Sequence, residues 1–183
     1  MSEQELLARL RAGDADAFDA IFRSLYPPLV GLAEGMLRQR AVAEETVQDV
    51  MLELWRRRES LVLEESLRAY LFRAVRNRAL NHLRHEKVER RGEPFAAGES
   101  SSPPSAQDAL EEEEIDAALR EAVGALPERC REVFELSRVR GLRYAEIAAA
   151  MGISVKTVEA QMGKALRLLR ERLAPWLPDA DDG

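Results

Sequence analysis

The sequence predicts an all-α protein made of two small helical domains joined by a flexible acidic linker. Hydrophobic residues make up 46% and charged residues 33% of the 183 positions, while glycine (10) and proline (8) are few, which is typical of a helix-rich chain. No stretch alternates apolar and polar residues with the period of two that marks a β-strand. Residues 93–109 combine Pro, Gly and Ser with few large apolar side chains, and they therefore separate two segments.

This separation sets the expected domain boundaries. The N-terminal domain comprises residues 1–92, the linker residues 93–113, the C-terminal domain residues 114–174 and an acidic tail residues 175–183. Both domains are small, but each is large enough for a helical core. The glutamates at 111–114 also suit the first turn of a helix, because carboxylates interact favourably with the helix dipole.

Four helices are expected in the N-terminal domain. Residues 2–5 form a capping-box pattern ahead of leucines at helical spacing. A second helix over 14–38 is expected to break or kink at Pro27-Pro28, because proline lacks the amide donor. The third helix covers 44–58, and the fourth covers 66–87 with a serine as its cap.

The C-terminal domain has the pattern of a helix-turn-helix. A helix is expected to begin at Pro127 and end near Val139. A short helix over 144–151 ends at Gly152, and a longer helix over 154–173 follows with a serine cap. Helix, tight turn with glycine, and second helix is the arrangement that places a recognition helix in DNA.

The net charge of -6 hides an uneven distribution along the chain. Residues 93–116 carry eight acidic and no basic residues, whereas residues 117–174 carry eleven basic and seven acidic ones. Residues 68–91 hold eight basic and two acidic residues, so positive charge is concentrated near one helix. Local surfaces that face phosphates are therefore expected in an acidic protein.

Several classes of protein are excluded. No apolar run approaches the ~20 residues that cross a bilayer, and the acidic start lacks the features of a signal peptide, so a cytoplasmic protein without membrane insertion is expected. The single cysteine, Cys130, is expected to be a small buried hydrophobe. His82 and His85 make an incomplete ligand set, so neither a metal nor another cofactor is expected. No catalytic constellation occurs, and the chain is not expected to be an enzyme.

Two blocks of the sequence resemble a known family. The segment that begins Leu126-Pro127-Glu128-Arg129 and extends to Arg170 resembles region 4 of the extracytoplasmic-function sigma factors. Residues 43–50, with Leu54-Trp55 and residues 76–81, resemble region 2 of the same family, in the same order. The resemblance implies a transcription initiation factor that binds core RNA polymerase and promoter DNA, recognises the -35 duplex and the opened -10 strand, and is controlled by an anti-sigma factor.

The resemblance also implies roles for particular residues. The core-polymerase surface would consist of Glu45, Gln48, Asp49, Glu53 and Trp55. The -10 element would meet Leu61, Val62 and Leu63 in a loop without aromatic residues, together with Arg73, Arg76, Asn77, Asn81 and Arg84. The -35 element would meet Lys156, Thr157, Ala160, Gln161, Lys164 and Arg167, with base edges read at the start of the helix and phosphates bound by Lys164 and Arg167. The polymerase surface could instead be a charged solvent face with Trp55 half in the core, and the recognition helix could instead be a solvated amphipathic helix of a bundle.

Alternatives remain open on the sequence alone. A stand-alone helix-turn-helix regulator would bind its operator without polymerase, and a helical adaptor would bind protein only. At Glu159, Ala160 and Gln161, many family members have basic residues instead. The -35 sequence that this protein prefers therefore cannot be inferred from those members. The acidic stretch 93–116 fits either a simple tether or a nucleic-acid mimic that follows basic channels of the polymerase.

Overall fold

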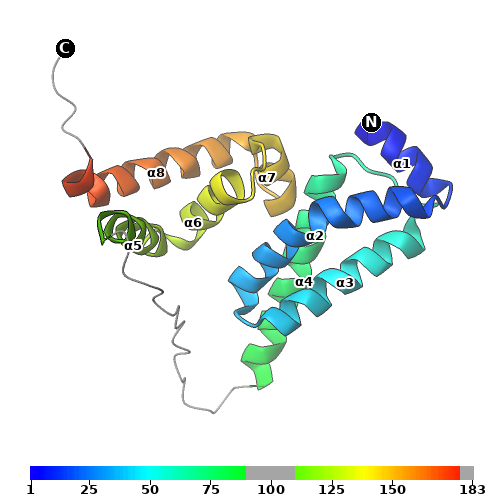
Figure 1. The fold of residues 1–183 in the computed structure, drawn as a ribbon, viewed down its shortest axis with the longest axis horizontal. Coiled ribbons are helices and arrows are strands. Elements are labelled where there is room, and N and C mark those ends of the chain that lie inside the picture. Colours follow the sequence, from blue (N-terminus) through cyan, green and yellow to red (C-terminus); the bar gives the residue numbers. More distant parts are fainter. Residues whose placement is uncertain (90–109, 178–183) are drawn as a thin grey trace. The chain divides into compact units, whose positions relative to one another are not determined.

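The structure is a computed structural model that describes residues 1–89 and 110–177, and all regular secondary structure in these ranges is helical. This confirms the all-α prediction. Two compact units are distinguished, the first built on α1–α4 and the second on α5, α6, α8 and most of α7 (Figure 1). Most of the expected linker and tail lies outside the described residues. No helix within the described ranges is both long and apolar enough to span a membrane.

The N-terminal unit consists of α1 (Glu3–Arg11), α2 (Ala15–Leu37), α3 (Arg40–Arg57) and α4 (Leu67–Glu89). Helices α2, α3 and α4 pack against one another (Figure 1). Their shared core is formed by fully buried side chains, the largest being Ile21, Leu29, Met51, Leu54, Leu71 and Phe72. Each such side chain contributes roughly 1.5–3 kcal/mol relative to an exposed position, so this core holds the three helices in place.

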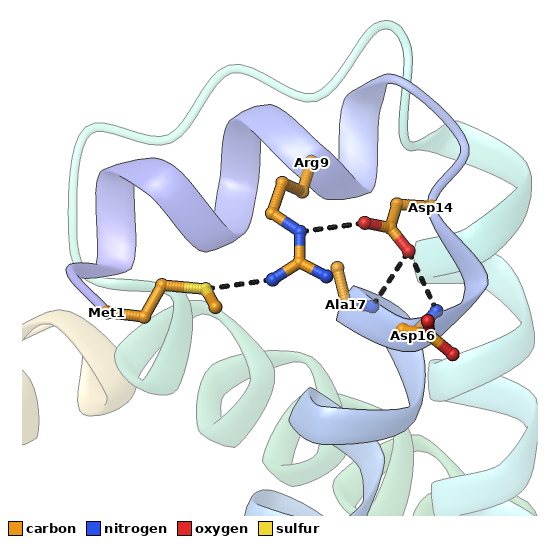
Figure 2. A network of polar contacts seen from close by, with 5 residues as sticks. All are labelled: Met1, Arg9, Asp14, Asp16 and Ala17. Atoms are coloured by element: carbon orange, nitrogen blue, oxygen red, sulfur yellow. Dashed lines mark hydrogen bonds and ion pairs between the residues drawn. The ribbon is translucent and has the colours of Figure 1, made fainter.

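The junction between α1 and α2 is fixed by polar contacts around Asp14 (Figure 2). Asp14 Oδ1 accepts hydrogen bonds from the backbone N–H groups of Asp16 (2.9 Å) and Ala17 (3.4 Å), and therefore caps α2. Its other oxygen accepts from Arg9 Nε at 2.7 Å. The hydrogen bond from the Arg9 guanidinium lowers the pKa of the Asp14 carboxyl below its ordinary value, so the cap stays ionised to lower pH than an ordinary aspartate would.

Helix α2 is not broken at Pro27-Pro28 but continues to Leu37, and its ribbon bends along its length (Figure 1). A proline inside a helix costs about 3 kcal/mol relative to alanine. Ile21 before the prolines and Leu29 after them are both buried in the same core. Packing on both sides of the prolines therefore offsets their cost, and of the two predicted outcomes a break is ruled out.

Helix boundaries agree with the sequence where a cap defines them. Ser2 and Glu5 form the predicted capping box, and Ser66 Oγ accepts from Ala69 N at 3.1 Å at the start of α4. Helix α3, in contrast, begins four residues before the predicted start. Its N-cap makes no side-chain hydrogen bond, and Arg40 pairs with Glu34 and Glu44 at 3.2 and 3.0 Å instead.

The C-terminal unit contains α5 (Leu110–Gly124), α6 (Glu128–Phe134), the π-helical turn η1 (Glu135–Val139), α7 (Tyr144–Met151), α8 (Val155–Leu173) and the 3-10 turn η2 (Ala174–Trp176). Helices α5 and α6 both pack on α8. Their core consists of Ala122, Leu126, Cys130, Ala165 and Leu169. Cys130 is thus a buried free thiol, as predicted.

Several local predictions for this unit need adjustment. Helix α5 begins at Leu110, within the segment assigned to the linker. Pro127 is the N-cap of α6 rather than its first residue. The helical segment does reach Val139 as predicted, but its last turn, η1, is π-helical rather than α-helical. Val155, in the first turn of α8, is 41% exposed, whereas the apolar residues Val158, Met162, Ala165 and Leu169 further along the helix are buried.

The turn between α7 and α8 has the predicted chemistry. Gly152 adopts φ +68, a left-handed conformation that glycine accepts without strain, and Ile153 N donates to Ala148 O at 3.0 Å. Ser154 then caps α8 by accepting from Thr157 N at 3.1 Å. The start of α7 is held by the buried Glu146, which accepts from Arg143 N at 3.1 Å. The two helices of the helix-turn-helix therefore begin and end at defined residues.

Candidate nucleic-acid and polymerase interfaces

The outer face of α8 carries most of the residues expected to meet the -35 element. Lys156, Ala160, Lys164 and Arg167 are all exposed, and their spacing of four, four and three residues places them on one side of the helix. The opposite side buries Val158, Met162, Ala165 and Leu169. Thr157 is half-buried beside this face, with its hydroxyl 2.8 Å from Ser154 Oγ. We call Lys156, Ala160, Lys164 and Arg167 the α8 stripe.

Gln161 occupies a different position from the rest of this set. It is half-buried, and its Oε1 accepts a hydrogen bond from Cys130 Sγ of α6 at 2.9 Å. A bidentate contact with adenine uses both the oxygen and the nitrogen of a glutamine amide. Gln161 would therefore have to exchange its bond with Cys130 to read a base, and its role as a base reader stays a prediction.

Helix α4 presents a second stripe with the same spacing. Arg73, Asn77, Asn81 and Arg84 are four, four and three residues apart and lie on one side of the helix, opposite the buried Val75 and Ala79. We call these four residues the α4 stripe. Asn77, Asn81 and Arg84 are exposed, whereas Arg73 is half-buried and pairs with Glu65 at 2.6 Å. Arg76 lies beside the stripe and is half-buried.

The three apolar residues of the loop that precedes α4 differ in their exposure to solvent. Leu61 is 7% exposed, Leu63 is half-buried and Val62 is 84% exposed. Only Val62 of the three is therefore fully available for contact with a partner. The carbonyl of Leu61 accepts a hydrogen bond from Arg11 of α1 at 2.9 Å, so the loop is attached to a distant part of the chain.

The predicted polymerase surface lies on α3. Glu45, Gln48 and Asp49 are exposed, while Glu53 is half-buried and pairs with Arg57 and Arg78 at 3.1 and 3.7 Å. Glu45 and Asp49 also line a small cleft between α3 and α4, whose other lining residues are Val42, Thr46, Arg78 and His82. The structure thus brings the two carboxylates together with two basic side chains of α4.

Trp55 belongs to an aromatic group that the sequence interpretation missed. Its ring meets the edge of Phe18 at 5.3 Å, and the Arg58 guanidinium lies 4.2 Å above it. Phe18 is the first of three aromatic residues on α2, followed by Phe22 and Tyr26 at intervals of four. This spacing places them on one helix face and could have indicated the group in advance.

Comparison with known proteins identifies the family. Residues 21–88 match the family Sigma-70 region 2, and residues 116–169 match Sigma-70, region 4. The ECF RNA polymerase sigma factor SigK of Mycolicibacterium vanbaalenii is 30% identical over an alignment that covers 92% of this chain and 87% of that protein. The chain belongs to the extracytoplasmic-function sigma factors. The RNA polymerase sigma-H factor of Pseudomonas aeruginosa is 25% identical to this sigma factor over 97% of each chain.

Solved structures show the same fold as this sigma factor. CnrH in complex with the cytosolic domain of CnrY has a TM-score of 0.65 at 24% identity, and covers 94% of this chain and 97% of its own. RpoE of Bartonella quintana in complex with the anti-sigma factor NepR has a TM-score of 0.64 at 23% identity, and covers 86% of this chain and 96% of its own.

Family membership decides between the functions that the sequence left open. The match to region 2 covers residues 21–88. Neither a stand-alone helix-turn-helix regulator nor a helical adaptor would be expected to contain this region. This sigma factor directs RNA polymerase to promoters, and its family is one of non-catalytic transcription initiation factors. Both the α4 stripe and the α8 stripe lie within the matched regions.

Proposed function

We propose that this sigma factor binds core RNA polymerase through the acidic face of α3, holds the opened -10 strand with the 59–65 loop and the α4 stripe, and reads the -35 duplex with the α8 stripe. The observation that carries the proposal is the pair of stripes. Each places cationic and small polar or apolar residues on the exposed side of a helix whose other side is buried, one in each matched region. The factor itself is no enzyme and acts in the cytoplasm, where the polymerase supplies the catalysis.

At the -35 element, the chemistry of the α8 stripe suits a major groove. Lys156, near the helix start, reaches base edges or the flanking phosphates, and Lys164 and Arg167 further along reach phosphates. Ala160 between them is small enough to let the helix approach closely and to contact a thymine methyl group. The predicted contacts of Thr157 and Gln161 would add to these at the edge of the groove.

At the -10 element, the α4 stripe combines two kinds of contact. Arg73 and Arg84 supply positive charge for phosphates, with Arg76 beside them, and Asn77 and Asn81 supply donors and acceptors for base edges. Val62 supplies an exposed apolar side chain for a base that has left the stack. Because Leu61 and Leu63 are turned partly or wholly inward, they shape the loop rather than extend its contact surface.

At the polymerase, the α3 face offers negative charge. Glu45, Gln48 and Asp49 are exposed along one side of the helix and complement a basic partner surface, with Glu53 and Trp55 at its far end. We also propose that an anti-sigma factor controls this protein. Two structures that share its fold are the complexes of CnrH with CnrY and of RpoE with the anti-sigma factor NepR.

The proposal is tested with full-length protein, core polymerase and a promoter library randomised at -35 and -10. Lys164→Ala should weaken all promoters about equally and lower the salt slope of binding by about one, because a phosphate contact carries no sequence information. Arg120→Ala, at an exposed arginine of α5, is the matched control. A library profile and salt slope unchanged by Lys164→Ala would show that the α8 stripe does not face DNA.

A further inference from the structure

We propose that α1 sets the conformation of the 59–65 loop, and that Glu3 and Arg11 are positioning residues for recognition of the unstacked -10 base. The inference rests on the proposed role of this loop. Neither residue was singled out by the sequence, because nothing in the spacing of α1 points to contacts 50 and 64 positions away.

Two hydrogen bonds connect α1 to the two ends of the loop. Arg11 Nη2 donates to the Leu61 carbonyl at 2.9 Å, and Glu3 Oε1 accepts from the backbone N–H of Leu67 at 3.0 Å. Glu3 and Arg11 are at opposite ends of α1, about 12 Å apart along the helix axis at 1.5 Å per residue. The helix therefore spans the loop and holds it at its entry and at its exit.

Between the residues that these bonds hold in place, one apolar side chain of the loop is available to contact a base. Leu61, whose carbonyl is bound, is 7% exposed, and the adjacent Val62 is 84% exposed. At the other end, Ser66 caps α4 and Glu65 pairs with Arg73 at 2.6 Å. Val62 thus lies between two held points of the loop, Leu61 and Glu65, and its direction depends on where Arg11 holds the Leu61 carbonyl.

Helix α1 is itself firmly placed, which a positioning element requires. Its N-terminus is closed by the capping box of Ser2 and Glu5, and Leu7 and Leu10 are buried in the core. Its C-terminus is tied to α2 by Arg9, which bonds Asp14 and also contacts Met1 Sδ at 3.1 Å (Figure 2). The side chains that hold the loop therefore project from a helix fixed at both ends.

Because α1 holds the loop, we expect the two hydrogen bonds to control which -10 bases are accepted rather than how tightly the protein binds core polymerase. A preformed loop presents Val62 at a fixed position, so a base of the wrong shape meets a surface that does not adapt. A loop released at one end would adapt to several bases. Loss of one hydrogen bond of this kind corresponds to roughly a 3- to 10-fold change in an equilibrium, which sets the expected size of the effect.

The experiment measures open-complex formation by reconstituted holoenzyme on promoters that differ only at single -10 positions. Arg11→Met and Glu3→Ala should each lower the discrimination between the preferred and the substituted -10 bases by about 3- to 10-fold. Arg11→Lys and Glu3→Gln, which keep a donor or an acceptor, should restore part of it. Discrimination at -35 and affinity for core polymerase should stay as in the control Arg23→Met, an exposed arginine of α2.

Val62→Ala distinguishes the inference from the function on which it rests. If Val62→Ala lowers -10 discrimination but Arg11→Met and Glu3→Ala do not, α1 does not position the loop and the proposed function stands. If Val62→Ala also has no effect, the loop does not read the -10 base, and both this inference and the proposed role of the loop fail. Equal losses of -10 discrimination, -35 discrimination and core affinity in the α1 variants would show a general folding role and overturn the inference.

Discussion

At the scale of single residues, the exposed face of α8 includes a glycine that the protein's own packing does not require. Gly163 lies beside Lys164 in the middle of the helix, and a Cβ added there would meet no other atom within 4 Å. Glycine inside a helix costs roughly 0.5–1 kcal/mol relative to alanine. A close approach of DNA to the backbone would account for a residue that stability alone disfavours.

Gly163→Ala is therefore expected to separate stability from function. The free energy of unfolding should rise by about 0.5–1 kcal/mol, because alanine loses less backbone entropy, while transcription from -35-dependent promoters should fall. Gly35→Ala is the matched control, since this exposed glycine of α2 also has open space around it. It should give the stabilisation without the loss. Full promoter activity in Gly163→Ala would exclude a close approach at this position.

Gln161 gives a second test at this scale. If its amide exchanges the bond with Cys130 for a base, Gln161→Ala should change which -35 bases are accepted by roughly 1–3 kcal/mol of discrimination. If it serves only to satisfy the buried thiol, the library profile should stay unchanged while thermal stability falls slightly. Promoter selection from a randomised -35 library, alongside a melting curve, distinguishes the two outcomes.

At the scale of elements, α3 has a core side that is complete without its acidic residues. Ala43, Val47, Val50, Met51 and Leu54 are buried, whereas Asp49 is exposed. Asp49→Arg should leave the circular dichroism spectrum and the melting temperature nearly unchanged but reduce affinity for core polymerase, because a reversed charge at an interface costs several kcal/mol. Glu121→Arg, on an exposed part of α5, controls for the change in net charge. A folded Asp49→Arg protein with intact core affinity would count against the α3 face.

The elements also show what the sequence could predict. Caps at Ser2, Ser66 and Ser154 were correct because the donors that they bind lie three residues away, so the chemistry is local. Whether α2 breaks or only bends at Pro27-Pro28 could not be decided from the sequence, because its continuity depends on core packing on both sides of the prolines. The early start of α3 was missed, since Arg40 pairs with a residue of the preceding helix.

The distinction between local patterns, which the sequence reveals, and non-local contacts, which it does not, applies to the candidate sites as well. The α4 and α8 stripes follow from helical periodicity, so their residues could be named in advance. Non-local contacts could not be named. The bond between Cys130 and Gln161 joins two helices, and Trp55 meets an aromatic residue of α2. The loop contacts of Arg11 and Glu3 span 50 and 64 positions, and no local pattern encodes such a distance.

At the scale of the whole molecule, the net charge of -6 limits what the protein does alone. A few cationic residues on each stripe, in an acidic chain, should give only weak binding to free DNA, with a Kd near ~10⁻⁴ to 10⁻⁶ M at physiological salt. Core polymerase should strengthen binding at promoters sharply. Electrophoretic shifts with and without core enzyme measure this difference. Nanomolar, sequence-specific binding by the protein alone would favour a stand-alone regulator.

The attachment of α1 also has a consequence for how the N-terminal unit opens. Contacts between residues 50 and 64 positions apart stabilise the fold only after the chain between them has lost the entropy of loop closure. Helix α1 is therefore expected to dock after α2–α4. Because α1 buries little beyond Leu7 and Leu10, it should also detach at a lower free energy than global unfolding requires. The amide proton of Leu67 should then exchange with solvent through this partial opening, at the same free energy as the amides of α1. Native-state hydrogen exchange would reveal the two as one cooperative unit.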